Sequence, residues 1–235
     1  MKFSDVIGHE SIKTEIRKEI LSGNIAHAKM FYGKSGYGTL PLALCFAQFI
    51  FCQQKTDQDS CGVCPSCKRV QEFNHPDVHY VYPIVKKDED ETSISLITEW
   101  REQLTSNSYF DLSTWSDKIE SKNIRPIIRA NESAEIIHKL TLKSYEGGPK
   151  VMIIWMAEEM NLQCSNKLLK IIEEPPTDTY IILVCENIEK VLITIQSRTQ
   201  KINVPRISQD DLSLFLSHNF QLNRADADAA ATFAE

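Results

Sequence analysis

The sequence lacks the features of a membrane-embedded or secreted chain. No run of apolar residues approaches the roughly 20 residues that a membrane-spanning helix needs. The amino-terminal stretch MKFSDVIGHE also lacks the apolar region of about 7–15 residues that a secretory signal peptide carries. We therefore expect a cytoplasmic protein without membrane contact, in a compartment that keeps thiols reduced.

The chain also lacks an excess of positive charge. It carries 26 lysines and arginines against 32 aspartates and glutamates, a formal net charge of -6 at pH 7. This balance provides no overall basic field for nucleic acid, so any DNA contact would have to be local or supplied by partners. With 235 residues, 42% of them hydrophobic, the chain is long enough for one large domain with a sizeable core.

Seven cysteines in a reducing compartment suggest bound metal or buried thiols instead of disulfides. Four of them follow the pattern C-x8-C-x2-C-x2-C: Cys52, Cys61, Cys64 and Cys67. Two overlapping C-x-x-C knuckles predict a zinc site, with an iron–sulfur cluster as the main rival. Four thiolates would close the shell around one structural zinc per chain and leave no open position for catalysis. The other three cysteines are predicted to be buried thiols: Cys45, Cys164 and Cys185.

Strands alternate with helices along much of the chain. Runs rich in Val, Ile and Leu predict buried strands at 26–33, 75–85, 150–156, 179–186 and 200–205. The spacing of apolar residues predicts helices at 9–23, 39–52, 129–145, 161–174 and 188–195. This order is typical of an α/β fold with a parallel sheet that helices cover on both faces. Residues 208–235 look like one helix and the start of another.

Residues 86–122 interrupt this alternation. They contain the acidic run Asp88–Glu91, two tryptophans (Trp100 and Trp115) and many Ser, Thr and Asn residues. This composition predicts an inserted excursion on the protein surface with some helix.

The stretch FYGKSGYGTLPLA at residues 31–43 looks like a phosphate-binding loop between a strand and a helix. Such a loop has the pattern G-x-x-x-x-G-K-[ST], in which the lysine contacts the β and γ phosphates and the hydroxyl holds Mg²⁺. If Lys34 were that lysine, the first glycine would fall on Ala28, and Gly36 and Gly38 would lie inside the helix. We therefore reject this register.

The alternative register starts at Gly33, directly after the strand, and ends at Gly38, where the helix begins. It places Thr39 at the lysine position and Leu40 at the hydroxyl position. The backbone cradle and the helix dipole could remain, but the ammonium and the metal-binding hydroxyl are gone. By itself, the loop could equally be an ordinary strand-to-helix turn.

The strand KVMIIWM occupies the place of a Walker B strand, which should end in Asp-Glu. Trp155 and Met156 stand at those two positions, so a magnesium-binding carboxylate is missing as well. Glu158 and Glu159 follow the strand tip, and we interpret them as solvated helix residues. Two independent losses in one pocket argue against hydrolysis of nucleotide there.

The ordered set of motifs resembles one family. It comprises IGHESIKTEI, AHAKMFYG, the glycine loop, the four-cysteine pattern, HPD at residues 75–77, NKLLKIIEEPP and SRT at residues 197–199. This order is similar to that of bacterial clamp-loader ATPase-like subunits of DNA polymerase III, in particular the delta-prime family. The resemblance covers roughly residues 1–85 and 124–215.

The resemblance implies an AAA+ fold with a zinc module and a place in a pentameric assembly that loads the sliding clamp onto primed DNA. It implies gamma/tau and delta subunits as direct partners, with the clamp and DNA as indirect ones. It also implies a subunit that does not bind ATP and Mg²⁺ productively. Arg198 matches the arginine finger of the family's Ser-Arg-Cys motif, although Thr199 replaces the cysteine. The polar sensor position falls on Cys185 or Glu186.

The resemblance also predicts the division of the chain. We expect an AAA+ core at 1–204, with the zinc module at 52–67 and the inserted segment at about 86–122. We expect residues 205–235 to begin a small helical lid that is truncated, and the oligomerisation collar of the family to be absent. Two other functions stay open: a gamma/tau-like active ATPase with an atypical loop, and a zinc-dependent nucleic-acid-binding module.

Overall fold

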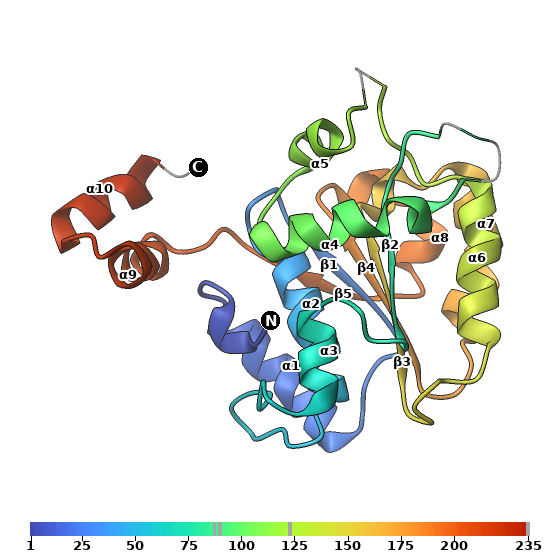
Figure 1. Cartoon of the computed structure of the whole chain (residues 1–235), viewed down its shortest axis with the longest axis horizontal. Helices are drawn as coiled ribbons and strands as arrows, with labels where there is room; N and C mark the ends of the chain where they lie inside the picture. The colour runs from blue at the N-terminus through green and yellow to red at the C-terminus, as the bar shows by residue number, and fades with distance from the viewer. Residues whose placement is uncertain (87, 89–90, 122–123, 234–235) are drawn as a thin grey trace.

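A computed structural model gives the fold of residues 1–235 except 87, 89–90, 122–123 and 234–235, so part of the acidic run lies outside the described residues. One parallel sheet contains β1 (Ala28–Tyr32), β2 (Val78–Val81), β3 (Lys150–Trp155), β4 (Thr179–Cys185) and β5 (Gln200–Asn203). The strand order is β2-β3-β4-β1-β5 (Figure 1). The predicted parallel sheet is confirmed, although each strand is shorter than its apolar run.

The α-helices before β3 are α1 (Glu10–Ser22), α2 (Thr39–Phe51), α3 (Pro65–Gln71), α4 (Ile97–Ser106), α5 (Leu112–Lys118) and α6 (Ala130–Thr141). Those after β3 are α7 (Leu162–Glu173), α8 (Ile193–Gln196), α9 (Gln209–Phe220) and α10 (Arg224–Phe233). Short 3-10 turns occur at η1 (Phe3–Asp5), η2 (Ser93–Leu96), η3 (Ala157–Glu159) and η4 (Ile188–Lys190).

Helices cover both faces of the sheet, as predicted. Along β3, Val151 and Ile153 belong to a core shared with α1, α2, α4 and α5. Met152 and Ile154 belong to a second core, shared with α6, α7 and α8. Because successive side chains of a strand point to opposite faces, the two cores lie on opposite sides of the sheet.

Helix α2 is buried along its whole length, which explains its nearly continuous apolar sequence. All of its residues from Thr39 to Phe51 are buried, because the helix lies between the sheet and neighbouring helices. Pro41 falls in the first turn, where its missing N–H costs no helical hydrogen bond. The carboxyl end of α2 leads directly into Cys52, the first residue of the cysteine cluster.

The prediction that residues 86–122 form a surface excursion with some helix holds for the helices α4 and α5 but is wrong for the tryptophans. Trp100 of α4 and Trp115 of α5 are 0% exposed and belong to the core beside α2. Trp100 stacks on Tyr82 with ring centroids 4.1 Å apart, and its centroid lies 5.3 Å from that of Trp155 at the end of β3. The inner faces of α4 and α5 therefore belong to the core, while most described residues of the segment are exposed or half-buried.

The end of the chain forms a helical pair. Helices α9 and α10 pack on one another and lie to the side of the sheet, after an extended segment that follows β5 (Figure 1). Ser213, Ala227 and Ala231 are buried between them. The helical tail was predicted, while the boundary at residue 204 between a core and a lid stays a prediction. Within the described residues, no helix is both long and apolar enough to cross a membrane.

Candidate functional site

The glycine loop joins β1 to α2 at the carboxyl edge of the sheet. The Gly33 N–H donates to the Cys185 carbonyl oxygen at 3.2 Å, which connects the loop to the end of β4. A Cβ atom on Gly33 would lie 2.3 Å from the Val204 carbonyl oxygen, which follows β5. Gly33 is therefore needed for the close passage of the loop past β5, whatever the loop binds.

Helix α2 begins at Thr39, as the register from Gly33 to Gly38 requires. Gly38 precedes it with φ of 93°, a conformation that favours glycine. Thr39 is only 8% exposed, and Leu40 is buried in the core that α2 shares with α1, α4 and α5. Neither side chain can supply an ammonium group or a metal-binding hydroxyl in an open pocket.

Two cavities border the loop, and the larger, of about 610 Å³, is lined by Ser35, Gly36, Tyr37 and Tyr109. A cavity of about 10 Å³ lies between Gly36, Gly38, Trp155 and Glu186, which is room for roughly one water molecule. Tyr109, from the segment between α4 and α5, contacts Gly38: a Cβ atom on that glycine would lie 3.3 Å from Cε1 of the tyrosine. Sequence reasoning missed Tyr109, because its segment was assigned to the surface.

The end of β3 offers no carboxylate at either Walker B position. Trp155 and Met156 are both buried in the core beside α2, and Met156 has a left-handed backbone with φ of 57°. The structure therefore places Trp155 at the end of β3 and Met156 directly after it, with the Glu186 side chain beside Trp155 in the same cavity.

The interpretation of Glu158 and Glu159 as solvated residues is wrong. Glu159 is buried and accepts from Arg125 Nε at 2.7 Å. Glu158 accepts from the backbone N–H groups of Glu186 at 2.7 Å and Asn187 at 3.0 Å. These partners lie far along the chain, so local sequence gave no sign of them.

The Glu186 side chain borders this small cavity, and its backbone N–H donates to the Glu158 carboxylate. Burial raises the pKa of Glu158 above its ordinary range, although the backbone donors oppose the shift. Burial and then the nearby Glu158 raise the pKa of Glu186, which also shares a hydrogen bond with the Ser35 side chain. Cys185, the other candidate sensor, is buried, and burial raises the pKa of its thiol.

The four cysteines predicted to bind metal come together. Their sulfur atoms all lie within 4.8 Å of one another, and the Sγ atoms of Cys61 and Cys67 are 4.0 Å apart. Zinc–sulfur bonds of about 2.3 Å in a tetrahedron require sulfurs about 3.8 Å apart, so the cluster fits zinc. Figure 1 places this module at α3, beside the carboxyl end of α2.

Backbone amides prepare the cluster for thiolates. The N–H of Cys61 donates to Cys52 Sγ at 3.2 Å, that of Cys64 to Cys61 Sγ at 3.4 Å, and that of Cys67 to Cys64 Sγ at 3.4 Å. The N–H groups of Val63 and Cys64 lower the pKa of Cys61 to about 6, whereas burial raises the pKa of Cys52. Donors aimed at sulfur favour the charged form that a metal needs.

Glu146 connects the cysteine module to the main fold. It forms an ion pair with Arg69 of α3 and lies 3.4 Å from Nε2 of the buried His75. Asp77 completes the connection, since it accepts from the backbone N–H groups of Tyr145 at 2.7 Å and Glu146 at 3.0 Å. His75 and Asp77 are the first and last residues of the HPD motif. The motif therefore holds the loop before β3 in place through these contacts. Sequence reasoning gave no role to Glu146.

Arg198 lies between α8 and β5, with its side chain 34% exposed. Its Nε donates to the Glu173 carboxylate at 2.7 Å, and its Nη1 donates to the Thr194 carbonyl oxygen at 3.1 Å. Glu173 belongs to the NKLLKIIEEPP motif at the end of α7. The structure thus brings these two motifs together on the surface.

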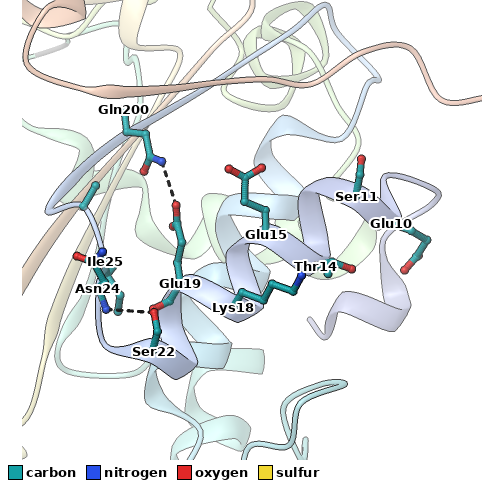
Figure 2. A pocket seen from close by; sticks show the side chains of 11 residues that line it. Glu10, Ser11, Thr14, Glu15, Lys18, Glu19, Ser22, Asn24, Ile25 and Gln200 are labelled. Carbon is teal, nitrogen blue, oxygen red and sulfur yellow. Dashed lines mark hydrogen bonds between the residues drawn. The ribbon is translucent and has the colours of Figure 1, made fainter.

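A separate groove runs along the outer side of α1 next to β5 (Figure 2). Its volume is about 1060 Å³, and Gln200 crosses it to donate to Glu19 at 2.9 Å. Glu15 and Lys18 also line it, so it carries charges of both signs. None of the candidate site residues lines this groove.

Comparison with known proteins identifies the family. The model of the family described as DNA polymerase III, delta subunit, matches residues 8–208. The DNA polymerase III subunit delta' of Bacillus subtilis is 31% identical over 178 residues, which cover 76% of this chain and 42% of that protein. The tau/gamma subunit of Haemophilus influenzae is 24% identical over 216 residues, 92% of this chain and 25% of that protein.

Among solved structures, the RuvB Holliday junction branch migration motor of Thermotoga maritima is similar, with a TM-score of 0.52 and 12% identity. The match covers 96% of this chain and 56% of that one and shows a shared AAA+ fold. The chain spans about 42% of the length of the delta' relative from Bacillus subtilis. Because the family model matches most of the sequence and the relatives at 26–31% identity include several delta' subunits, the chain belongs to the DNA polymerase III delta subunit family, in its delta-prime group.

Proposed function

We propose that this chain is a non-catalytic clamp-loader subunit that helps to assemble the loader and supplies an arginine finger to a neighbouring ATP site. The loader, with gamma/tau and delta subunits, would place the sliding clamp on primed DNA. The observation that carries the proposal is the glycine loop, which keeps its strand–loop–helix form but has Thr39 in place of the lysine. Without that ammonium, the chain cannot neutralise the β and γ phosphates of a nucleotide.

Titration of the chain with ATP and Mg²⁺ tests the non-catalytic part. We expect neither saturable binding at micromolar nucleotide nor turnover, because the lysine, the hydroxyl and the Walker B carboxylates are all replaced. Micromolar affinity together with hydrolysis that is lost on replacing Gly38 or Thr39 would instead favour the gamma/tau-like active ATPase.

The surface position of Arg198 supports a role in a neighbour's site. In this chain its guanidinium is held by one carboxylate, Glu173, on the protein surface. An exposed ion pair of this kind is weak, so a phosphate group of a docked neighbour could replace Glu173 as its partner. The contact with the Thr194 carbonyl oxygen would keep the side chain oriented during the exchange.

Replacing Arg198 with alanine in a loader reconstituted with this subunit should lower the ATPase rate at the adjacent site by about a hundredfold or more. The fold should stay intact, because the side chain is not part of either core. The total ATPase rate of the loader would fall by the fraction that the adjacent site contributes. Lys201→Ala is the matched control, since Lys201 is an exposed cation on β5 nearby. Equal loader turnover for the two variants would refute the arginine-finger role.

A further inference from the structure

The segment between α4 and α5 lies directly on the glycine loop. The Tyr109 ring contacts Gly38, and its hydroxyl accepts from the backbone N–H of Ile7 at 2.9 Å. The next residue, Phe110, lies with its ring centroid 4.8 Å from that of Trp155, at the former Walker B position. One short segment thus touches the glycine loop, the chain that precedes α1 and the end of β3.

The segment is held in place by its own hydrogen bonds. The Asn107 side chain accepts from the Tyr109 N–H at 2.8 Å and donates to the Tyr109 carbonyl oxygen at 3.0 Å. Asp111 then caps α5 by accepting from the Thr114 N–H at 2.8 Å. Ser108 and Phe110 are buried on either side of Tyr109. The tyrosine is therefore presented by a fixed turn between two helices.

The cavity between the start of α2 and Trp155 is small as a result of these contacts. Its volume of about 10 Å³ suits about one water molecule, whereas a phosphate group has several heavy atoms. Loss of the lysine alone would weaken phosphate binding but leave the backbone cradle open. In this protein Ser108, Tyr109 and Phe110 line the small space that remains between the start of α2 and Trp155, while a cavity of about 610 Å³ is open on the side of Ser35 to Tyr37.

We propose that residues 107–110 are a built-in occupant of the former phosphate space between the start of α2 and the end of β3, and that they keep Gly38 and Thr39 covered in the presence and in the absence of nucleotide. The segment takes the place of a ligand and joins the loop to the residues before α1 through the Tyr109–Ile7 hydrogen bond. This goes beyond the proposed function, because it would stand even if Arg198 had no role in a neighbour's site. The proposal assigns a specific structural role to residues 107–110 of the inserted segment.

The binding test separates a blocked space from a missing lysine. The double substitution Thr39→Lys with Leu40→Ser restores the loop pattern, and a second protein adds Tyr109→Ala. MgATP and inorganic tripolyphosphate are titrated into both proteins by calorimetry, and circular dichroism checks that both are folded. We expect the protein with Tyr109→Ala to bind at least about tenfold more tightly. Tripolyphosphate should behave like ATP, because the blocked space is the phosphate space.

Hydrogen exchange tests the closed loop in the otherwise unaltered chain. Tyr109→Ala should accelerate exchange of the amides from Gly36 to Leu40 by at least about tenfold. Tyr109→Phe keeps the ring on Gly38 and should change it less. Ile94→Ala, at an exposed site of the same inserted segment, is the control and should change nothing. Equal affinity of the two repaired proteins, or unchanged exchange in Tyr109→Ala, would overturn the proposal.

Discussion

At the scale of single residues, buried titratable groups set the response of this fold to acid. His79 lies on β2, and its pKa is lowered to about 4, first by burial and then by the charge of Lys139. The unfolded chain has the ordinary histidine pKa of 6.5. Between these two values the unfolded state binds a proton that the folded state does not, so stability falls as the pH is lowered through this window.

His79→Gln should therefore reduce the loss of stability on acidification. Between pH 7 and pH 5 we expect the free energy of unfolding to drop by about 1–2 kcal/mol less in the variant, after allowance for partial exposure of the ring. Urea unfolding at both pH values measures this difference. His218→Gln, at an exposed position on α9, should follow the unaltered chain, and equal acid sensitivity of His79→Gln would contradict the assignment.

Some features of single residues could be predicted from the sequence, and others could not. The cysteine spacing predicts a cluster because all four ligands lie within 16 consecutive residues, Cys52 to Cys67. Thr39 could be recognised because the loop pattern fixes its position. Glu159 could not, since its partner Arg125 precedes it by 34 residues and only the folded chain brings the two together.

At the scale of elements, the cysteine module and α3 join the main fold through the chain at both ends and through several polar contacts. Glu146 pairs with Arg69 and lies beside His75, and Asp59 accepts from the backbone N–H groups of Phe3 and Ser4. The module has its own small cluster of buried cysteines, separate from the two cores of the sheet. Metal removal should therefore act locally.

Chelation should loosen residues 52–73 and leave the sheet folded. Elemental analysis should give about one zinc per chain, and hydrogen exchange after chelation should rise in this segment but not in β1, β3 or β4. Cys64→Ser should lose the metal, while Cys164→Ala, at a buried cysteine of the second core, should keep it. Iron in place of zinc would favour the iron–sulfur alternative, and global unfolding on chelation would contradict a local role.

The inserted segment illustrates where the prediction of exposure from composition failed. Its Ser, Thr and Asn content indicated an exposed excursion, yet α4 buries Trp100, Gln103 and Leu104 on one face. These positions are three and four residues apart, a helical spacing that was present in the sequence. The polar residues belong to the opposite, solvent-facing side. Composition averaged over the segment hid this division, and the contact with the glycine loop had no sequence signal.

At the scale of the whole molecule, the acidic balance separates this chain from an independent DNA-binding protein. A net charge of -6 disfavours contact with phosphates, so affinity for DNA should come from partners in an assembly. We expect no salt-sensitive complex of the isolated chain with duplex or primed DNA in fluorescence anisotropy at about 50 mM salt. Tight binding that weakens steeply with salt would revive the zinc-dependent nucleic-acid-binding alternative.

The strand order also has a consequence for biosynthesis. β1 lies between β4 and β5, so the first strand to leave the ribosome pairs with the last two. Until residues 179–203 have emerged, β1 has neither neighbour, and α2 lacks the finished sheet that buries it. A nascent chain that stalls before β4 therefore exposes an apolar helix to solvent, a surface that chaperones bind and that promotes aggregation. Folding of this protein must wait for nearly complete translation of the sheet region.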